Sequence, residues 1–251
     1  MHQPFDRRLR RQAQRRGAML MQGHDFLHRH VGEELEARKA LAGIPQAGPS
    51  LHIGKRALAR SDTLIVDAGS LCADVFADED LLPFADGSFA RITALMTLHG
   101  VNDLPGALLL CRRMLLPGGH FAAAFPAGHC LGAVRQAFLE ADSAQGGSVS
   151  PRVGPTVDPA QGAGLLQRAG FVDPVGDVET LTVRYRSLAD LARDVRANGD
   201  SGWLEARSRH FTSKARWAAA EAIFQKQAEA DGKVPVSLQI LYLSAKAPKA
   251  L

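Results

Sequence analysis

The sequence predicts an α/β domain with a doubly wound, mostly parallel sheet, and three observations carry this prediction. Between residues 50 and 125, short apolar runs alternate with segments of helical spacing, which is typical of βαβ units. Residues 178–185 alternate apolar and polar side chains with period two, and 236–245 form a last apolar run, so we expect a closing antiparallel pair. The chain has 251 residues, of which 46% are apolar, enough to bury a substantial core without disulfides or metal ions.

The elements follow in order from the N-terminus. Residues 5–43 have helical spacing and the Gly- and Pro-rich stretch 43–49 ends it, so we expect an N-terminal helical arm over 1–45 and the α/β domain over 46–251. The expected strands are 50–53, 63–66, 90–96, 120–125, 178–185 and 236–245. The expected helices are 104–116, 131–142, 161–169, 188–197 and 203–230, the last two within a helical insertion at about 186–232.

Positive charge is concentrated near the start of the chain. The net charge is +4, and residues 5–16 contain one aspartate and six arginines, which are Arg7, Arg8, Arg10, Arg11, Arg15 and Arg16. Such an arm suits an acidic protein, RNA or an anionic membrane surface, and the alternative is a helix face that stays solvated.

The cysteines and histidines indicate neither a disulfide scaffold nor a metal site. Cys72, Cys111 and Cys130 form no Cys-x-x-Cys pair, which fits a reducing compartment. The histidines at 24, 28 and 30 lie near one another, but no cysteine or acid completes a ligand set there, so we expect no metal. No apolar run approaches the ~18 residues of a membrane-spanning helix.

A doubly wound sheet binds its ligand outside the carboxyl ends of its strands, and the residues there suggest a cofactor. Gly54 follows the first strand and is either a tight-turn glycine under a ligand or one that only permits the turn. Asp67 ends the second strand, where an acid suits two ribose hydroxyls; a solvated strand-end aspartate is the alternative. The acids of 78–80 face the same crevice or form a solvated loop.

The stretch 78–89, Asp-Glu-Asp-Leu-Leu-Pro-Phe-Ala-Asp-Gly-Ser-Phe, is followed by Leu-His-Gly-Val-Asn-Asp-Leu-Pro-Gly-Ala at 98–107. Together they resemble class I S-adenosylmethionine-dependent methyltransferases of the type 11 kind. With 5–9, 150–153, 165–171, 181–185, 194–199 and 231–235, the chain is most similar to the methyltransferase-like assembly factors of respiratory complex I. The malonyl-carrier-protein methyltransferase of the biotin pathway is a more distant relative. The resemblance covers about residues 5–245 and implies a Rossmann-like methyltransferase fold with a seven-stranded sheet.

The resemblance also implies a binding site for the methyl donor, S-adenosylmethionine. Gly54 corresponds to the glycine under the donor's methionine moiety, and Asp67 to the acid that takes the ribose hydroxyls. Asp78 and Glu79 correspond to residues near the adenine.

Two more positions correspond to residues beside the transferring methyl group. Leu98 and His99 follow the expected strand 90–96. We expect His99 to be either a general base or a structural histidine, because this position is not securely catalytic in the family. Catalytic residues are otherwise unassigned.

The first strand-to-helix turn departs from the family pattern. His52 stands where the family has the acid that orients the donor's ammonium group, and Lys55 and Arg56 follow Gly54. A basic side chain there would repel a sulfonium cofactor. Only 12 residues separate Gly54 from Asp67, so the first crossover helix is expected to be short. We therefore expect S-adenosylmethionine to bind weakly or not at all.

Three functions compete on these observations. The first is a methyltransferase that acts on a protein in respiratory complex I assembly, or on a carrier protein or small acid. The second is an inactive methyltransferase-fold scaffold that chaperones a partner subunit, with protein arginine hydroxylation as another activity attributed to the family. The third, nucleic-acid modification, has only the basic arm in its favour. We expect a protein partner, a respiratory-complex subunit or assembly factor, with peripheral membrane contact as a further possibility. The expected compartment is the bacterial cytoplasm or the mitochondrial matrix.

Overall fold

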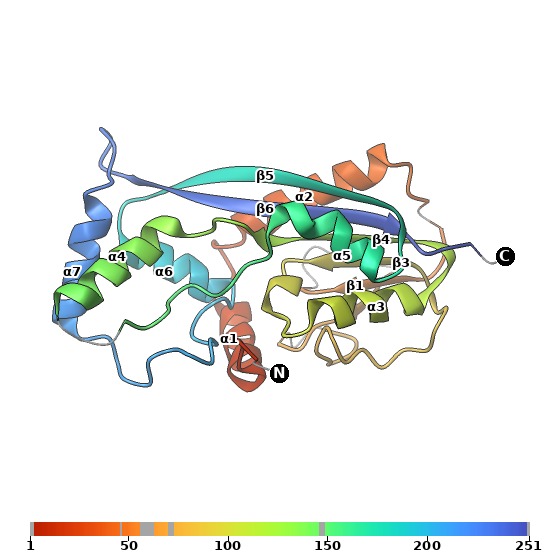
Figure 1. Cartoon of the computed structure of the whole chain (residues 1–251), viewed down its shortest axis with the longest axis horizontal. Coiled ribbons are helices and arrows are strands. Elements are labelled where there is room, and N and C mark those ends of the chain that lie inside the picture. The colour runs from red at the N-terminus through yellow and green to blue at the C-terminus, as the bar shows by residue number, and fades with distance from the viewer. Residues whose placement is uncertain (1–2, 46, 56–62, 70–72, 146–148, 250–251) are drawn as a thin grey trace. The chain divides into compact units, whose positions relative to one another are not determined.

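The computed structural model describes residues 3–45, 47–55, 63–69, 73–145 and 149–249 (Figure 1). The chain divides into two compact units, each assembled from several stretches. The sheet unit contains Asp25–Gly128, Val157–Glu179 and Ile240–Leu251, and the helical unit contains Met1–His24, His129–Thr156 and Thr180–Gln239. The boundary between 45 and 46 stays a prediction from the sequence.

Six strands form the sheet: β1 (Ser50–Ile53), β2 (Leu64–Val66), β3 (Phe89–Leu95), β4 (Leu115–Ala127), β5 (Val172–Tyr185) and β6 (Val234–Lys246). Their order is β2-β1-β3-β4-β6-β5. β1 pairs in parallel with β2 and β3, and β3 pairs in parallel with β4, which confirms the doubly wound, mostly parallel α/β fold. In this register His52 of β1 lies opposite Thr93 of β3.

The side-chain contacts of β5 and β6 indicate the expected antiparallel pair. Near its start, β5 contacts the end of β6 through Asp173 and Lys246, whose carboxylate and ammonium are 3.0 Å apart. Further along β5, Glu179 accepts a 2.7 Å hydrogen bond from Tyr242, which comes earlier in β6. Rising numbers on one strand meet falling numbers on the other, as in antiparallel neighbours.

Over the described residues the sheet has six strands, where seven were expected. The missing strand would follow β2, and there the structure has one isolated parallel bridge between Val66 and Val75. An isolated bridge is too short to count as a strand. Residues 56–62, where we expected a shortened crossover helix, lie outside the described residues.

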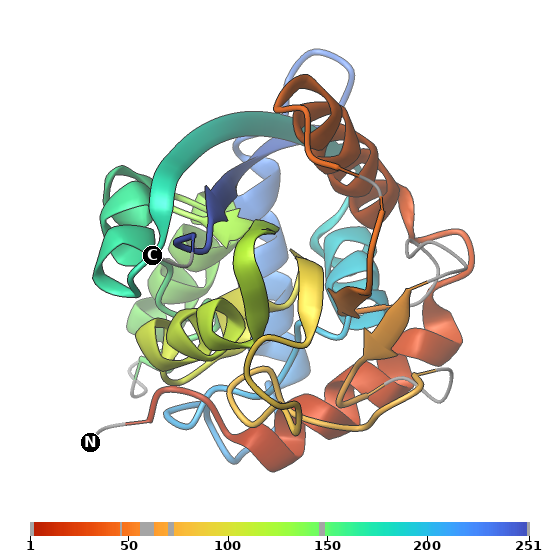
Figure 2. The same ribbon diagram turned by 90° about the vertical axis from the view of Figure 1, so that its right-hand side faces the viewer.

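Helices cover both faces of the sheet. Figure 2 shows α3 (Leu104–Met114) and α5 (Gly162–Arg168) on one face and α2 (Phe26–Leu41) on the other. The Asn-Asp-Leu-Pro-Gly string starts α3, because the Asp103 carboxylate accepts a 2.9 Å hydrogen bond from the Gly106 N–H as the N-cap. The core between α3, α5 and the strands includes Leu108, Phe121 and Phe125.

A polar network attaches α2 to β5 and β6. Glu179 accepts hydrogen bonds from Tyr242 and pairs with His30, whose Nε2 is 2.9 Å from its carboxylate. Arg38 stacks over the Tyr242 ring at 3.9 Å and bonds the Asp177 carboxylate at 2.9 Å. These contacts fix the position of α2 along the sheet.

The helical unit contains α1 (Arg7–Leu20), α4 (Gly132–Ala144), α6 (Leu188–Ala197) and α7 (Lys214–Gln225). Phe138 of α4 and Phe224 of α7 belong to the core of this unit. The buried Asp142 of α4 faces two arginines: Nε of Arg216 is 3.2 Å and a terminal nitrogen of Arg152 is 3.7 Å from its carboxylate.

Two expected helices are interrupted in the structure. The helical stretch 5–43 is two helices, α1 and α2, with Gly23 at φ 81° between them. The expected helix 203–230 is wrong over its first part, because α7 begins only after Ser213, whose side chain accepts from the Arg216 N–H as an N-cap. The segment before it is a loop that packs Trp203 against Phe5, with ring centroids 4.8 Å apart. No helix in the described part of the chain is long and apolar enough to cross a membrane.

Candidate functional site

The carboxyl ends of β1, β2 and β3 meet at one edge of the sheet unit, and Gly54 forms the turn there. Gly54 is buried with φ +123°, and its N–H donates a 2.9 Å hydrogen bond to the Val66 carbonyl. A Cβ at this position would lie 2.6 Å from the carbonyl oxygen of Leu95, so a larger residue would collide with β3. The turn therefore requires glycine for the fold itself, and its place under a donor stays a prediction.

His52 is the most unusual side chain at this edge. It is 4% exposed, and burial together with the nearby Lys39 charge lowers its pKa to about 4. A hydrogen bond to the Lys55 backbone acts in the opposite direction, which identifies the ring as its donor. Among the described residues Nε2 has no hydrogen-bond partner, so the neutral ring presents a lone pair from this nitrogen.

His52 itself therefore adds no positive charge to this turn, and the repulsion expected from Lys55 and Arg56 stays a prediction. A histidine with a pKa of about 4 is neutral at neutral pH and does not repel a cation. Its Nε2 retains one property of the acid that it replaces, since it can accept a hydrogen bond. It lacks the negative charge that strengthens such a bond.

Lys39 of α2 brings a positive charge to the same corner, and its position there was not predicted from the sequence. Its side chain is 7% exposed, and its ammonium lies 2.7 Å from the Glu36 carboxylate and 3.2 Å from the Thr93 hydroxyl. Thr93 is the cross-strand neighbour of His52, which explains why Lys39 affects the imidazole. The pairing with Glu36 offsets part of this charge. Arg56 lies outside the described residues.

Asp67 follows β2 and is 8% exposed, so it is not the solvated aspartate of the alternative interpretation. Its carboxylate accepts a 2.7 Å hydrogen bond from the N–H of Gly69, which holds the turn after the strand. That Asp67 also holds the hydroxyls of a ribose stays a prediction.

The acidic stretch after Val75 is also buried. Asp78 is 6% and Glu79 4% exposed, which excludes a solvated loop. The Glu79 carboxylate accepts a hydrogen bond from the hydroxyl of Thr97 and so reaches the end of β3. Glu79 and the segment 97–99 are thus brought together by contact.

The segment after β3 has a strained backbone. Met96 has φ +52°, a left-handed conformation that is uncommon for residues other than glycine. Its N–H bonds the Ala124 carbonyl at 2.8 Å, which holds this conformation against β4. Leu98, 1% exposed, and the partly buried His99 follow in a short 3-10 helix, Leu98–Gly100. Such strain clusters at functional sites, and the sequence pattern of a plain strand did not reveal it.

The edge thus has two chemically different parts. Asp67, Asp78 and Glu79 provide buried carboxylates suited to hydroxyl and amino groups. The corner at His52 provides a neutral acceptor beside a paired lysine. No group of three or more His, Cys, Asp or Glu side chains in the described ranges is arranged to hold a metal ion.

Comparison with known proteins agrees with this geometry. Residues 40–123 match the methyltransferase domain family Methyltransf_11, a range that includes β1, β2, β3 and the acidic stretch. The mitochondrial arginine-hydroxylase NDUFAF5 of Danio rerio is 27% identical over 260 residues, which cover 95% of this chain and 81% of the relative. The human NDUFAF5 is 32% identical over 67% of this chain, but the match spans only 49% of that protein.

A second kind of relative also matches. The malonyl-[acyl-carrier protein] O-methyltransferase of Xylella fastidiosa is 32% identical over 69% of this chain and 57% of the enzyme.

Among solved structures, the YcgJ protein of Bacillus subtilis superposes with a TM-score of 0.54 at 11% identity. The superposition covers 87% of this chain and 99% of that one. A Bacillus halodurans protein, provisionally described as a methyltransferase, superposes with a TM-score of 0.53 at 13% identity, over 86% of this chain and 99% of its own. These two share the fold. The chain therefore belongs to the class I S-adenosylmethionine-dependent methyltransferase superfamily and lies close in sequence to the NDUFAF5 family.

Proposed function

We propose that the protein acts on or chaperones a partner protein during assembly of a respiratory complex, as a relative of NDUFAF5 with an altered donor site. The observation that carries this proposal is the 27% identity to the Danio rerio protein over 95% of the chain. That match extends well beyond the methyltransferase domain at 40–123 and takes in most of the helical unit. A similarity limited to the donor-binding domain would not extend over so much of the chain.

The site supports weak binding of S-adenosylmethionine. The buried acids Asp67, Asp78 and Glu79 suit the adenosine part, whereas His52 offers the amino group only a neutral acceptor. Replacing a charge-assisted hydrogen bond by a neutral one costs about 1–1.5 kcal/mol, or roughly tenfold in affinity. Under the proposed function, the substrate of this site is a side chain of a partner protein. Arginine is the first candidate, because the NDUFAF5 relatives are named arginine hydroxylases.

Calorimetric titration with S-adenosylmethionine and S-adenosylhomocysteine tests the donor part of the proposal. We expect dissociation constants in the range of tens of micromolar or weaker. Submicromolar binding would contradict an altered donor site. If neither ligand binds at millimolar concentration, the protein chaperones its partner as an inactive scaffold, without methyl transfer.

A carrier-protein O-methyltransferase is the second candidate, supported by the Xylella fastidiosa relative. The two candidates differ in their acceptor. Incubation with labelled S-adenosylmethionine and malonyl-loaded carrier protein would label the carrier protein under the second candidate. Under the first candidate, the carrier protein stays unlabelled and a respiratory-complex subunit co-purifies with the protein. Mass spectrometry then shows whether an arginine of that subunit is modified.

We further propose that the protein works in the bacterial cytoplasm or the mitochondrial matrix, with no nucleic-acid partner. The named relatives of the NDUFAF5 kind are mitochondrial. The buried thiol of Cys111 is compatible with a reducing compartment.

A further inference from the structure

The helix α1 presents one charged face and packs the other. Arg8, Arg11 and Arg15 recur at a spacing that places them in one stripe, and all three are exposed. Arg16 is exposed beside them, and Met19, 74% exposed, extends the stripe. The stripe is therefore basic over two turns and apolar at its end.

The opposite face of α1 is held against the helical unit. A Cβ on Gly17 would lie 2.7 Å from the backbone nitrogen of Gly199, so the two backbones are in close contact. Arg10 is only 6% exposed, and its guanidinium lies 5.8 Å from the centroid of the Trp203 ring. Arg10 thus has a packing role, whereas Arg8, Arg15 and Arg16 are exposed on the opposite side of the helix.

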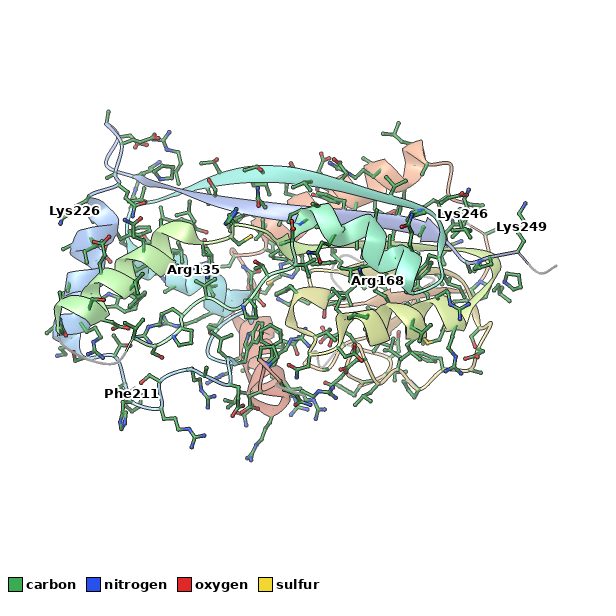
Figure 3. All side chains as sticks on the ribbon, in the orientation of Figure 1. Arg135, Arg168, Phe211, Lys226, Lys246 and Lys249 are labelled. Carbon is green, nitrogen blue, oxygen red and sulfur yellow. The ribbon has the colours of Figure 1, made fainter. Side chains whose placement is uncertain are left out.

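A second exposed segment lies beside the start of α1. The N–H of Glu205 donates a 2.9 Å hydrogen bond to the Pro4 carbonyl, and Phe5 forms an antiparallel bridge with Leu204. The loop continues to Phe211, which is 102% exposed and stands away from the ribbon in Figure 3. Arg209, two residues earlier, is also exposed. Aromatic and arginine side chains are both enriched at protein–protein interfaces, so an exposed ring two residues from an exposed arginine is a candidate contact for a partner.

We propose that the exposed arginines of α1, Arg8, Arg15 and Arg16, and the loop tip at Arg209 and Phe211 form one docking surface for an acidic segment of a partner protein. We call these five residues, four arginines and Phe211, the arginine face. The carboxylates of the partner pair with the guanidinium groups of this chain. Phe211 inserts into an apolar pocket of the partner, next to those carboxylates. This inference rests on the proposed function, because it names the surface by which the partner protein is held.

The composition of the surface favours a protein over a lipid bilayer. An interfacial helix inserts its own apolar face among the lipids, but the small-residue face of α1 is already packed at Gly17 and Ala13. The basic residues of α1 are all arginines, and the planar guanidinium group of arginine binds carboxylates in a bidentate manner. A fixed row of such groups matches carboxylates at a similar spacing on a folded or helical partner.

Two variants and one control test the inference in the full chain. The first variant is R8E/R15E/R16E, and the second is F211S. The control, R135E/R168E/K249E, makes the same change in net charge at three exposed positions that Figure 3 labels elsewhere on the surface. Circular dichroism and thermal melting report whether each variant folds.

The probe is a fluorescent peptide of 16 residues with Glu and Asp at helical i, i+4 and i+7 positions and one Leu pair. A second peptide replaces the Leu pair with Ser, and vesicles with and without 30% anionic lipid form the third probe. We expect R8E/R15E/R16E to weaken binding of the first peptide at least about tenfold, and the control to weaken it less than threefold. We expect F211S to weaken binding of the Leu peptide more than that of the Ser peptide.

Equal losses in the triple variant and the control would overturn the inference, because the attraction would then follow net charge alone. Binding to anionic vesicles that depends on Phe211, without binding to the peptide, would overturn it in favour of a membrane surface. Titration with S-adenosylhomocysteine separates this test from the proposed function. A triple variant that loses the peptide but keeps the nucleoside supports docking, whatever chemistry the site performs.

Discussion

Replacing His52 by Asp is the most direct test of how the altered corner limits donor binding. In the structure, the imidazole is neutral and its Nε2 has no partner among the described residues. An aspartate would restore a charged acceptor for the amino group of the donor. It would also pair with the buried Lys39, which offsets the cost of burying the new carboxylate.

The expected gain follows from the difference between two hydrogen bonds. A bond to a charged group contributes about 1.5–3 kcal/mol, and a neutral one about 0.5–1.5 kcal/mol. Their difference, about 1–1.5 kcal/mol, corresponds to roughly tenfold tighter binding. Competition from Lys39 for the new carboxylate lowers this gain, so we expect between threefold and tenfold, as estimated from the same difference.

Calorimetry with two ligands isolates the effect. S-adenosylhomocysteine carries the amino group, whereas 5′-methylthioadenosine lacks the whole amino-acid end. H52D should tighten only the first, and H52N, a neutral control, should tighten neither. If H52D folds normally and changes both ligands equally, or neither, then His52 does not face the amino-acid end and the reasoning is refuted.

Three further changes test the fold around and beyond the site. G54A places a Cβ 2.6 Å from the Leu95 carbonyl at φ +123°, so it should destabilise the chain by about 1–3 kcal/mol in urea unfolding, and an unchanged midpoint would contradict the close approach. D142A leaves two partly buried arginines without their carboxylate and should cost about 3–5 kcal/mol, whereas a loss below 1 kcal/mol would show that solvent replaces the pair. Burial raises the pKa of Glu179, but hydrogen bonds from His30 and the tyrosine of β6 outweigh it and leave the pKa lowered. Its stabilising effect is therefore present above the unfolded pKa and lost as pH falls through the folded one, so unfolding free energy should decline below about pH 4.5 in the wild type and less steeply in E179Q.

The regular elements of the fold were predictable because their signals are local. The apolar run 50–53 coincides with β1, and the amphipathic pattern 188–197 coincides with α6. The expected helix 203–230 failed over its first part because helical spacing of aromatic residues also arises when a loop packs Trp203 into a core. There the N-cap at Ser213, a local signal, was the better guide to the start of α7.

The site was predictable in its position but only partly in its chemistry. Gly54 and Asp67 follow β1 and β2, whose ends share an edge, so their place was predictable from the sequence. The acids at 78–79 follow the isolated bridge at Val75, and Glu79 reaches this edge through Thr97. Lys39 was missed because its approach to His52 depends on how α2 packs over β3, a contact between distant parts of the chain. The lowered pKa of His52 could not be predicted from the sequence for the same reason, since burial by the surrounding structure sets it.

The site residues that match the family pattern are also those that the fold uses. Gly54 avoids a collision with β3, Asp67 holds the turn at Gly69, and Glu79 bonds Thr97. His52, which departs from the pattern, bonds the Lys55 backbone and also has a nitrogen, Nε2, without a partner among the described residues. Structural need alone would therefore keep the first three in a chain that no longer transfers methyl groups, so their presence weighs little for catalysis. A donor that still binds must gain from its amino-acid end as well, and the difference in affinity between S-adenosylhomocysteine and 5′-methylthioadenosine measures that gain. A ratio near one in the wild type is the result expected of a scaffold that retains these acids for its fold, whereas a ratio of about ten or more that falls in H52A identifies His52 Nε2 as a working acceptor.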